Sequence, residues 1–406
     1  MKRLGRVARG RAGTSLAVSA LASSSGLLVA VAVARTSSVE DTGRFAIVMT
    51  ALLLTTAIAR SAVTDALVAG AARRPQDCRM LGRASAIGMF CGLALLAIGL
   101  VTESTYLITG ALAVHGLTMR ECIRGVLVAV GSARTAVVLE GAWSAINGLA
   151  FVGTLTGTWD GTVAFAVWAS SGALLGYVAA VLTASDTRPS WSGTPVPSAR
   201  SVAFAADTLI GSGVVQLVTW IATAIGGLPV AAALRGAGTL AGPVTTALTA
   251  ARAVLIPRSG RSLASSDGLR RSAVDAASMV GLAVPALVAL AFVPDRVGDA
   301  LLGDTWVLVG PILPLTALDL LFQLVAAVPE AAHRALGLGR RILTVRCSTA
   351  VVRLPAVIIA APHGIGAVVS VAATVTVLGA IAWWWSLATL GRPSTTSRVR
   401  PDVVPS

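Results

Sequence analysis

The chain has 406 residues, of which 55% are hydrophobic, 12% are charged and 4% are aromatic, and its formal net charge is +14. Soluble domains contain about 25% charged residues, so this composition excludes an ordinary soluble protein and favours a helical protein that crosses a membrane many times. The positive charge does not indicate nucleic-acid binding, because no basic segment alternates with Tyr or Phe residues on which bases could stack.

Long apolar stretches, each close to the ~20 residues that cross a hydrocarbon core as a helix, recur along the whole chain. The first follows a basic N-terminus, but it is longer than the apolar region of a secretory signal, and we interpret it as a membrane helix. The first six expected helices cover residues 14–34, 45–65, 85–102, 105–119, 137–155 and 161–183. The next six cover residues 205–225, 229–251, 273–293, 307–327, 347–361 and 365–388. The sequence therefore predicts an all-α polytopic membrane protein with about twelve transmembrane helices.

The stretch ASDTRPSWSGTPVPSAR, residues 184–200, is the one extended Pro- and Ser-rich segment between the expected helices. Such a composition is typical of a linker. We therefore expect two six-helix halves joined in the cytoplasm and followed by a cytoplasmic tail. The expected boundaries are 1–183 for the first half, 184–204 for the linker, 205–388 for the second half and 389–406 for the tail. Transporters often have two such halves, with the substrate site between them.

The distribution of Lys and Arg predicts the orientation of the chain. With the N-terminus in the cytoplasm, 26 of the 32 basic residues lie on the cytoplasmic side, whereas the outer loops carry only Arg35, Arg44 and Arg296. Cytoplasmic loops of membrane proteins are enriched in Lys and Arg. We therefore expect an even number of membrane spans and both termini in the cytoplasm.

Arg235 is the first candidate for a substrate-binding residue. It lies in the apolar stretch AAALRGAGTLAGP, residues 231–243, about 9 Å from the outer end of its expected helix. A charge at the centre of a membrane helix costs roughly 2.5–3.5 kcal/mol on insertion scales, and such residues usually face a bundle interior or a watery cavity. Extension of the long side chain to the outer headgroups remains the alternative.

Three other charged residues complete the set of substrate-binding candidates. Asp319, in LPLTALDLLFQLV, lies near the middle of its expected helix and is too short to reach the surface. Arg60 and Asp207 lie nearer the cytoplasmic ends of their helices, where Arg60 could extend to the headgroups and Asp207 could cap a helix. Because a guanidinium binds phosphate through two parallel hydrogen bonds, the arginines favour a phosphate-bearing lipid as substrate.

The chain shows no pattern for a metal, a cofactor or a catalytic centre. The four cysteines lack ligand spacing, and the three histidines are scattered without carboxylate pairs beside them. The outer loops are short, so a membrane-embedded glycan polymerase or glycosyltransferase is less favoured than a transporter. We predict a protein that is not an enzyme and that needs no cofactor.

Several stretches resemble the MOP exporter superfamily, which includes the MATE transporters, and within it the bacterial Wzx-type polysaccharide flippases. The stretch LGDTWVLVGPILPLTAL, residues 302–318, is similar to the start of the tenth helix in that family. Residues 231–261 resemble its eighth helix, and residues 339–377 resemble its eleventh helix, Gly-rich turn and twelfth helix. The resemblance covers nearly the whole chain.

The resemblance implies alternating access in a V-shaped protein that moves a lipid-linked oligosaccharide, a polyprenyl-pyrophosphate saccharide, to the outer leaflet for export of surface polysaccharide. It also implies that helices one, two, seven and eight surround the central cavity, which includes the helices of Arg60, Asp207 and Arg235. The partners implied are the lipid-linked substrate, membrane lipids and proteins of polysaccharide assembly.

Two alternatives to the flippase remain open. The same architecture also suits an ion-coupled exporter of drugs or metabolites, although a pump for cations should carry an acid deep in the first half, and we expect none there. A membrane scaffold without transport activity would tolerate replacement of all the intramembrane charges.

Overall fold

The computed structural model describes residues 2–66, 81–130, 132–185, 187–191, 198–262, 268–336 and 338–391, and the described residues are almost entirely helical. The first helices are α1 (Lys2–Thr36), α2 (Val39–Arg60), the π-helical η1 (Ser61–Asp65), α4 (Leu81–Val101), α5 (Thr105–Val130), α6 (Ala133–Leu155) and α7 (Gly161–Leu182). Then follow α8 (Ser198–Thr208), the π-helical η3 (Leu209–Gly213), α9 (Val214–Gly226), α10 (Leu228–Ser262) and α11 (Gly268–Ala291). The last are α12 (Asp295–Leu302), η4 (Gly303–Thr305), α13 (Trp306–Val309), η5 (Gly310–Ile312), α14 (Leu313–Ala335), α15 (Gly339–Ala360), η6 (Ala361–His363), α16 (Ile365–Ala388) and η7 (Thr389–Gly391).

Ten helical segments among the described residues are long and apolar enough to cross a membrane. The helices α5 and α10, of 26 and 35 residues, are the two further helices of comparable length. Local residues mark where several helices begin. The side chains of Ser38 and Asp160 cap the N-termini of α2 and α7, and Gly227, at φ +83°, allows the sharp turn before α10. The prediction of an all-α, multi-pass membrane protein is confirmed.

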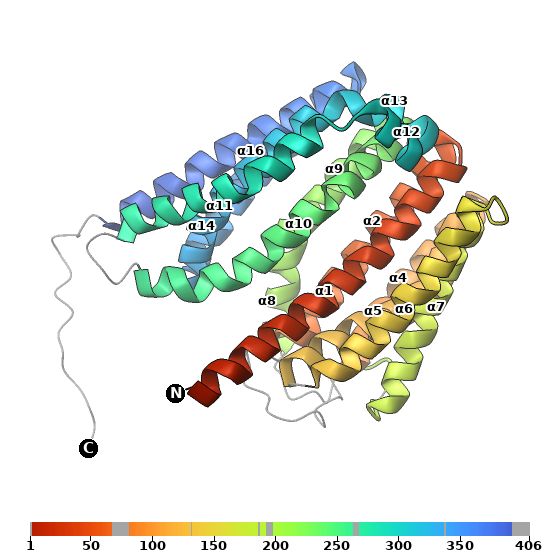
Figure 1. Cartoon of the computed structure of the whole chain (residues 1–406), viewed down its shortest axis with the longest axis horizontal. Helices are drawn as coiled ribbons and strands as arrows, with labels where there is room; N and C mark the ends of the chain where they lie inside the picture. Colours follow the sequence, from red (N-terminus) through yellow and green to blue (C-terminus); the bar gives the residue numbers. More distant parts are fainter. Residues whose placement is uncertain are drawn as a thin grey trace.

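The helices form two groups that meet near α12 and α13 and spread apart toward the chain termini (Figure 1). We call α1–α7 the N-terminal bundle and α8–α16 the C-terminal bundle. At one end, where α1 stops and α2 and α10 begin, the two bundles are in contact; we call this the convergent end. In the other direction α1 and α10 run side by side and then diverge toward the N-terminus of α1 and the C-terminus of α10 (Figure 1).

Each bundle has its own apolar core. In the N-terminal bundle the rings of Phe45, Tyr106, Phe165 and Trp168 pack edge to face or stacked, with centroids 5.5–6.1 Å apart. In the C-terminal bundle the core lies along α14, where apolar side chains pack against α10, α11 and α16. Its large buried members are Leu248, Leu287, Leu290, Leu302, Trp306, Ile312, Leu313, Leu320 and Leu324.

Several helices are longer than the hydropathy of the sequence predicts, and three of them illustrate the reason. The helix expected at residues 105–119 continues as α5 to Val130, the helix expected from residue 347 begins eight residues earlier as α15, and the helix expected from residue 205 begins at Ser198, inside the expected linker. The boundaries were wrong because charged residues ended the apolar windows, whereas tertiary partners satisfy those residues in the fold. Much of the expected tail, residues 392–406, and residues 192–197 of the expected linker lie outside the described residues.

Candidate functional site

The two bundles touch along a line that we call the seam, formed by α1, α2 and η1 on one side and by α8, η3, α9 and α10 on the other. Among the described residues, three side-chain hydrogen bonds cross it. The indole Nε1 of Trp220 donates to Thr50 Oγ1 at 2.6 Å, and Thr246 Oγ1 donates to Ser23 Oγ at 3.2 Å. The hydroxyls of Ser61 and Thr208 also hydrogen-bond, each at the border of a π-helical segment.

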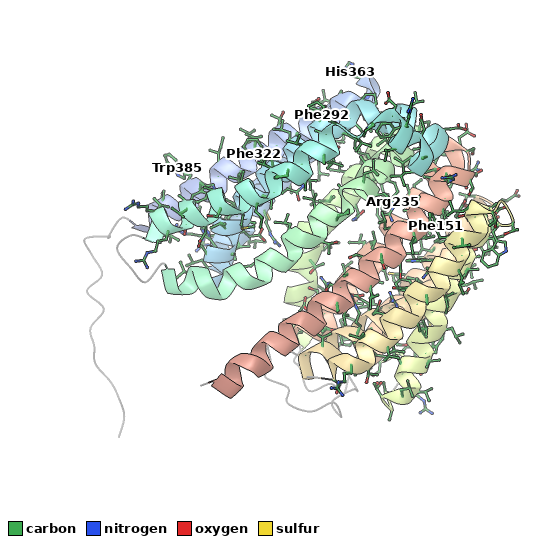
Figure 2. All side chains as sticks on the ribbon, viewed as in Figure 1. Phe151, Arg235, Phe292, Phe322, His363 and Trp385 are labelled. Carbon is green, nitrogen blue, oxygen red and sulfur yellow. The ribbon has the colours of Figure 1, made fainter. Side chains whose placement is uncertain are left out.

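Arg235 lies on α10 at the seam, about 10 Å along the helix axis from Leu228 (Figure 2). Its side chain is half-buried, and its Cζ lies 5.6 Å from the centroid of the buried Phe45 ring on α2. This distance is within the range of a cation–π interaction. Its Nε is buried and has no hydrogen-bond partner. Within the described part of the chain, no carboxylate oxygen lies within 4 Å of this guanidinium, so its charge is uncompensated.

The other two seam candidates both have ion-pair partners. Arg60 Nη1 lies 3.6 Å from Glu121 Oε1, and the Arg60 side chain is 49% exposed. Asp207 Oδ1 accepts a 2.7 Å hydrogen bond from Arg346, and Asp207 Oδ2 lies 3.9 Å from Arg334. The structure brings Arg60 and Asp207 to the same level, because the adjoining Ser61 and Thr208 are hydrogen-bonded.

Asp319 lies inside the C-terminal bundle rather than with the seam candidates. Its Oδ1 accepts a hydrogen bond from Thr376 at 2.5 Å and lies 3.9 Å from Arg353 Nη2, and its Oδ2 accepts one from Gln323 at 2.8 Å. Three helices, α14, α15 and α16, supply these groups. The carboxylate that seemed unpaired in the sequence is therefore held in a local hydrogen-bonded network.

The N-terminal bundle contains a buried acid seven residues after the start of α6, on the cytoplasmic side in the predicted orientation, and the absence of an acid at mid-depth in the first half stays a prediction. Glu140, on α6, is 1% exposed, and both of its oxygens accept from Arg120 Nη1 at 2.9 Å. Glu121 accepts from Arg124 on the next turn of α5. Sequence reasoning placed Arg120 and Arg124 in a cytoplasmic loop. Their (i, i+4) spacing is the signal that would have indicated a continuing helix face.

Pairing divides the intramembrane charges into two kinds. Arg235 has no carboxylate oxygen within 4 Å among the described residues, whereas such an oxygen lies within 4.0 Å of Arg60, Arg120, Arg124, Arg346 and Arg353. A desolvated cation without a counter-ion is unfavourable and binds an anion strongly when one can reach it.

Among the described residues, no group of three or more His, Cys, Asp and Glu side chains could hold a metal ion.

No protein-family model and no curated protein matches this sequence. Solved structures do. An inward-facing multidrug resistance MATE family transporter of the MOP superfamily matches with a TM-score of 0.66 at 13% identity, over 91% of this chain and 94% of that chain. Its likeness lies in the fold. This chain has the fold of MOP-superfamily transporters.

Two further structures agree with that fold. The lipid II flippase MurJ, in an inward closed conformation, matches with a TM-score of 0.65 at 12% identity, over 92% of this chain and 87% of that chain. A mutant of the MATE transporter VcmN from Vibrio cholerae matches with a TM-score of 0.59 at 13% identity, over 96% and 97% of the two chains. The fold is thus common to multidrug transporters and to a lipid flippase.

Proposed function

We propose that this protein is a transporter that moves a lipid-linked oligosaccharide across the bacterial cytoplasmic membrane, with the pyrophosphate of the substrate bound at the seam. The observation that carries the proposal is the unpaired guanidinium of Arg235 between the two bundles. An arginine suits phosphate oxygens because its planar N–H groups match them in pairs and it stays charged at all physiological pH values. The resemblance of residues 302–318 to polysaccharide flippases supports the same substrate class.

The carboxylates argue against a cationic substrate. Within the described residues, Glu121, Glu140, Asp207, Asp319 and Glu330 each lie within 4 Å of an arginine nitrogen. A site for an organic cation would need a carboxylate that is not already neutralised in this way. Asp65, the last residue of η1, is a seam carboxylate with no arginine nitrogen within 4 Å among the described residues, and it accepts from Ser61 Oγ at 3.4 Å at the end of the seam that is cytoplasmic in the predicted orientation. The unpaired charge beside Phe45, by contrast, is positive, which favours an anionic ligand at that position over the cationic drugs of an ion-coupled exporter.

Arg60 and Arg235 serve the substrate at different depths in this proposal, and the half-exposed Arg60 would exchange its 3.6 Å contact with Glu121 for the phosphate. Arg60 lies roughly 30 Å along α2 from Val39, whereas Arg235 lies about 10 Å along α10 from Leu228, near the same end. One pyrophosphate cannot bridge a separation of about 20 Å. The two guanidiniums therefore act as successive binding positions, with the half-exposed Arg60 first and Arg235 second on the outward path.

The test is transport in proteoliposomes that contain a fluorescent polyprenyl-pyrophosphate saccharide, with outward movement measured by a quencher that cannot cross the membrane. Arg235→Ala should lower the rate by about 100-fold or more, as expected when a charge-assisted hydrogen bond worth ~1.5–3 kcal/mol and the phosphate's counter-charge are both lost. Arg235→Lys should retain part of the rate because the charge remains.

Arg44→Ala is the matched control, because Arg44 pairs with Asp41 on its own helix and should leave the rate unchanged. Equal transport rates for Arg235→Ala and the parent would contradict the proposed substrate-binding role of Arg235. If the parent moves none of several phosphate-bearing lipids but does move an organic cation, the protein is an exporter rather than a flippase.

A further inference from the structure

At the convergent end the backbones of α2 and α10 touch. Gly43 of α2 faces Leu228, the first residue of α10, and a Cβ at Gly43 would lie 2.8 Å from Leu228 Cβ and closer still to its carbonyl oxygen. Close-packed atoms do not overlap in this way. Only glycine therefore lets the two helices approach so far, and any side chain at position 43 would force them apart.

A second contact at the convergent end joins the last turn of α1 to α12. Arg35 Nη1, at the end of α1, donates a 2.6 Å hydrogen bond to the carbonyl oxygen of Ala300 in α12, 265 residues along the chain. Gly303, which has the left-handed φ of +52° that favours glycine, packs on the same helix end. A Cβ there would lie 3.2 Å from Arg35 O and 3.3 Å from Ala34 O. The segment α12–η4 of the C-terminal bundle thus covers the end of α1 (Figure 1).

We propose that the Gly43–Leu228 and Arg35–Ala300 contacts form a seal that holds the seam closed at the convergent end and that separates when the two bundles open toward that side. Both contacts join one bundle to the other, and Arg235 lies only about 10 Å further along α10. On the predicted orientation this side is extracytoplasmic. The seal therefore stands between Arg235 and the outside, and its opening exposes the site whatever substrate the site binds.

The proposal predicts that a wedge in the seal exposes the seam. The reporter is Thr239→Cys, because Thr239 lies one turn beyond Arg235 on α10 and the residue is 7% exposed. The background lacks the native thiols of Cys78, Cys91, Cys122 and Cys347, each replaced by Ala. A maleimide that cannot cross the membrane is added to membranes of either orientation, and the labelling rate is measured from each face.

Gly43→Ala should raise the labelling rate from the convergent side by about tenfold or more, since minor conformations are ordinarily about 0.1–10% populated and the wedge favours the open one. Gly242→Ala is the matched control on α10, because its Cβ meets no atom within 4 Å, and it should label at the parent rate. Labelling of the Gly43→Ala protein at the parent rate would overturn the proposal, as would an equal rise in both proteins.

Arg35→Ala supplies a second arm, because Arg35 is exposed and its replacement leaves the cores intact. Arg35→Ala should also speed labelling, whereas Arg44→Ala, which removes another exposed arginine of the same end, should not. If Gly43→Ala fails to fold, as judged by gel filtration, the pair of arginine variants decides the question. Because labelling needs no substrate, this test remains valid if the transport assay is negative. A negative labelling result likewise leaves the transport assay valid.

Discussion

Arg120 in the N-terminal bundle and Arg235 at the seam are the same residue type in membrane helices, yet their surroundings differ. Arg120 donates to both oxygens of Glu140, and its Cζ lies 3.4 Å from the centroid of the Trp143 ring. Arg235 has a more distant ring, that of Phe45, and no carboxylate among the described residues. Both charges are costly to bury, but only Arg120 is compensated inside the protein.

In our proposal this difference separates a structural charge, that of Arg120, from a substrate-binding one, that of Arg235. Removal of one partner of a buried ion pair leaves the other charge uncompensated and destabilises the fold. Removal of an unpaired buried charge relieves a desolvation cost instead, so it should spare the fold and affect only what the charge binds. The comparison thus predicts opposite effects on stability and on transport for substitutions in the two regions.

The largest loss of stability is expected for Glu140→Gln. The amide keeps an acceptor for Arg120 but removes the negative charge, which should lower the free energy of unfolding by about 3–5 kcal/mol. The measurement is denaturation by a titrated anionic detergent, followed by tryptophan fluorescence. Replacement of the whole pair, Arg120→Met with Glu140→Leu, should recover most of the loss. A stable Glu140→Gln protein would show that the pair is not structural.

A smaller loss is expected for Arg353→Met in the C-terminal bundle. Asp319 would lose its cationic neighbour at 3.9 Å but would keep its hydrogen bonds from Thr376 and Gln323. Because the pair is partly exposed, the free energy of unfolding should fall by about 1–3 kcal/mol in the same titration. A larger loss than that of Glu140→Gln would contradict the ranking of the two pairs by burial.

The smallest effect on stability, with the largest effect on transport, is expected for Arg235→Met. Methionine fills a similar volume without the charge, so the free energy of unfolding should stay within about 0.5 kcal/mol of the parent or rise. A loss as large as that of Glu140→Gln would mean that Arg235 is structural and would abolish the distinction between the two regions.

The sequence alone determined the class of the protein and most of its helices. Apolar runs near the length of a hydrocarbon core are a local property, so the all-α multi-pass fold could be predicted before any tertiary contact was known. Helix ends were less predictable. The hydropathy of α5 falls at Arg120, yet the helix continues to Val130, because Glu140 and Glu121 neutralise the arginines that would otherwise need water.

Position in the sequence also marked Arg235, Arg60, Asp207 and Asp319 as unusual charges, because an ionisable residue inside an apolar run is visible without a structure. Only the tertiary structure decided which of them are paired. Asp319 and Thr376 are 57 residues apart, and Asp207 and Arg346 are 139 residues apart. Contacts between residues so far apart in the sequence cannot be predicted from periodicity, because they form only when helices from different parts of the chain pack together. That packing gives Asp319 and Asp207 their partners and leaves Arg235 without a carboxylate in the described part of the fold.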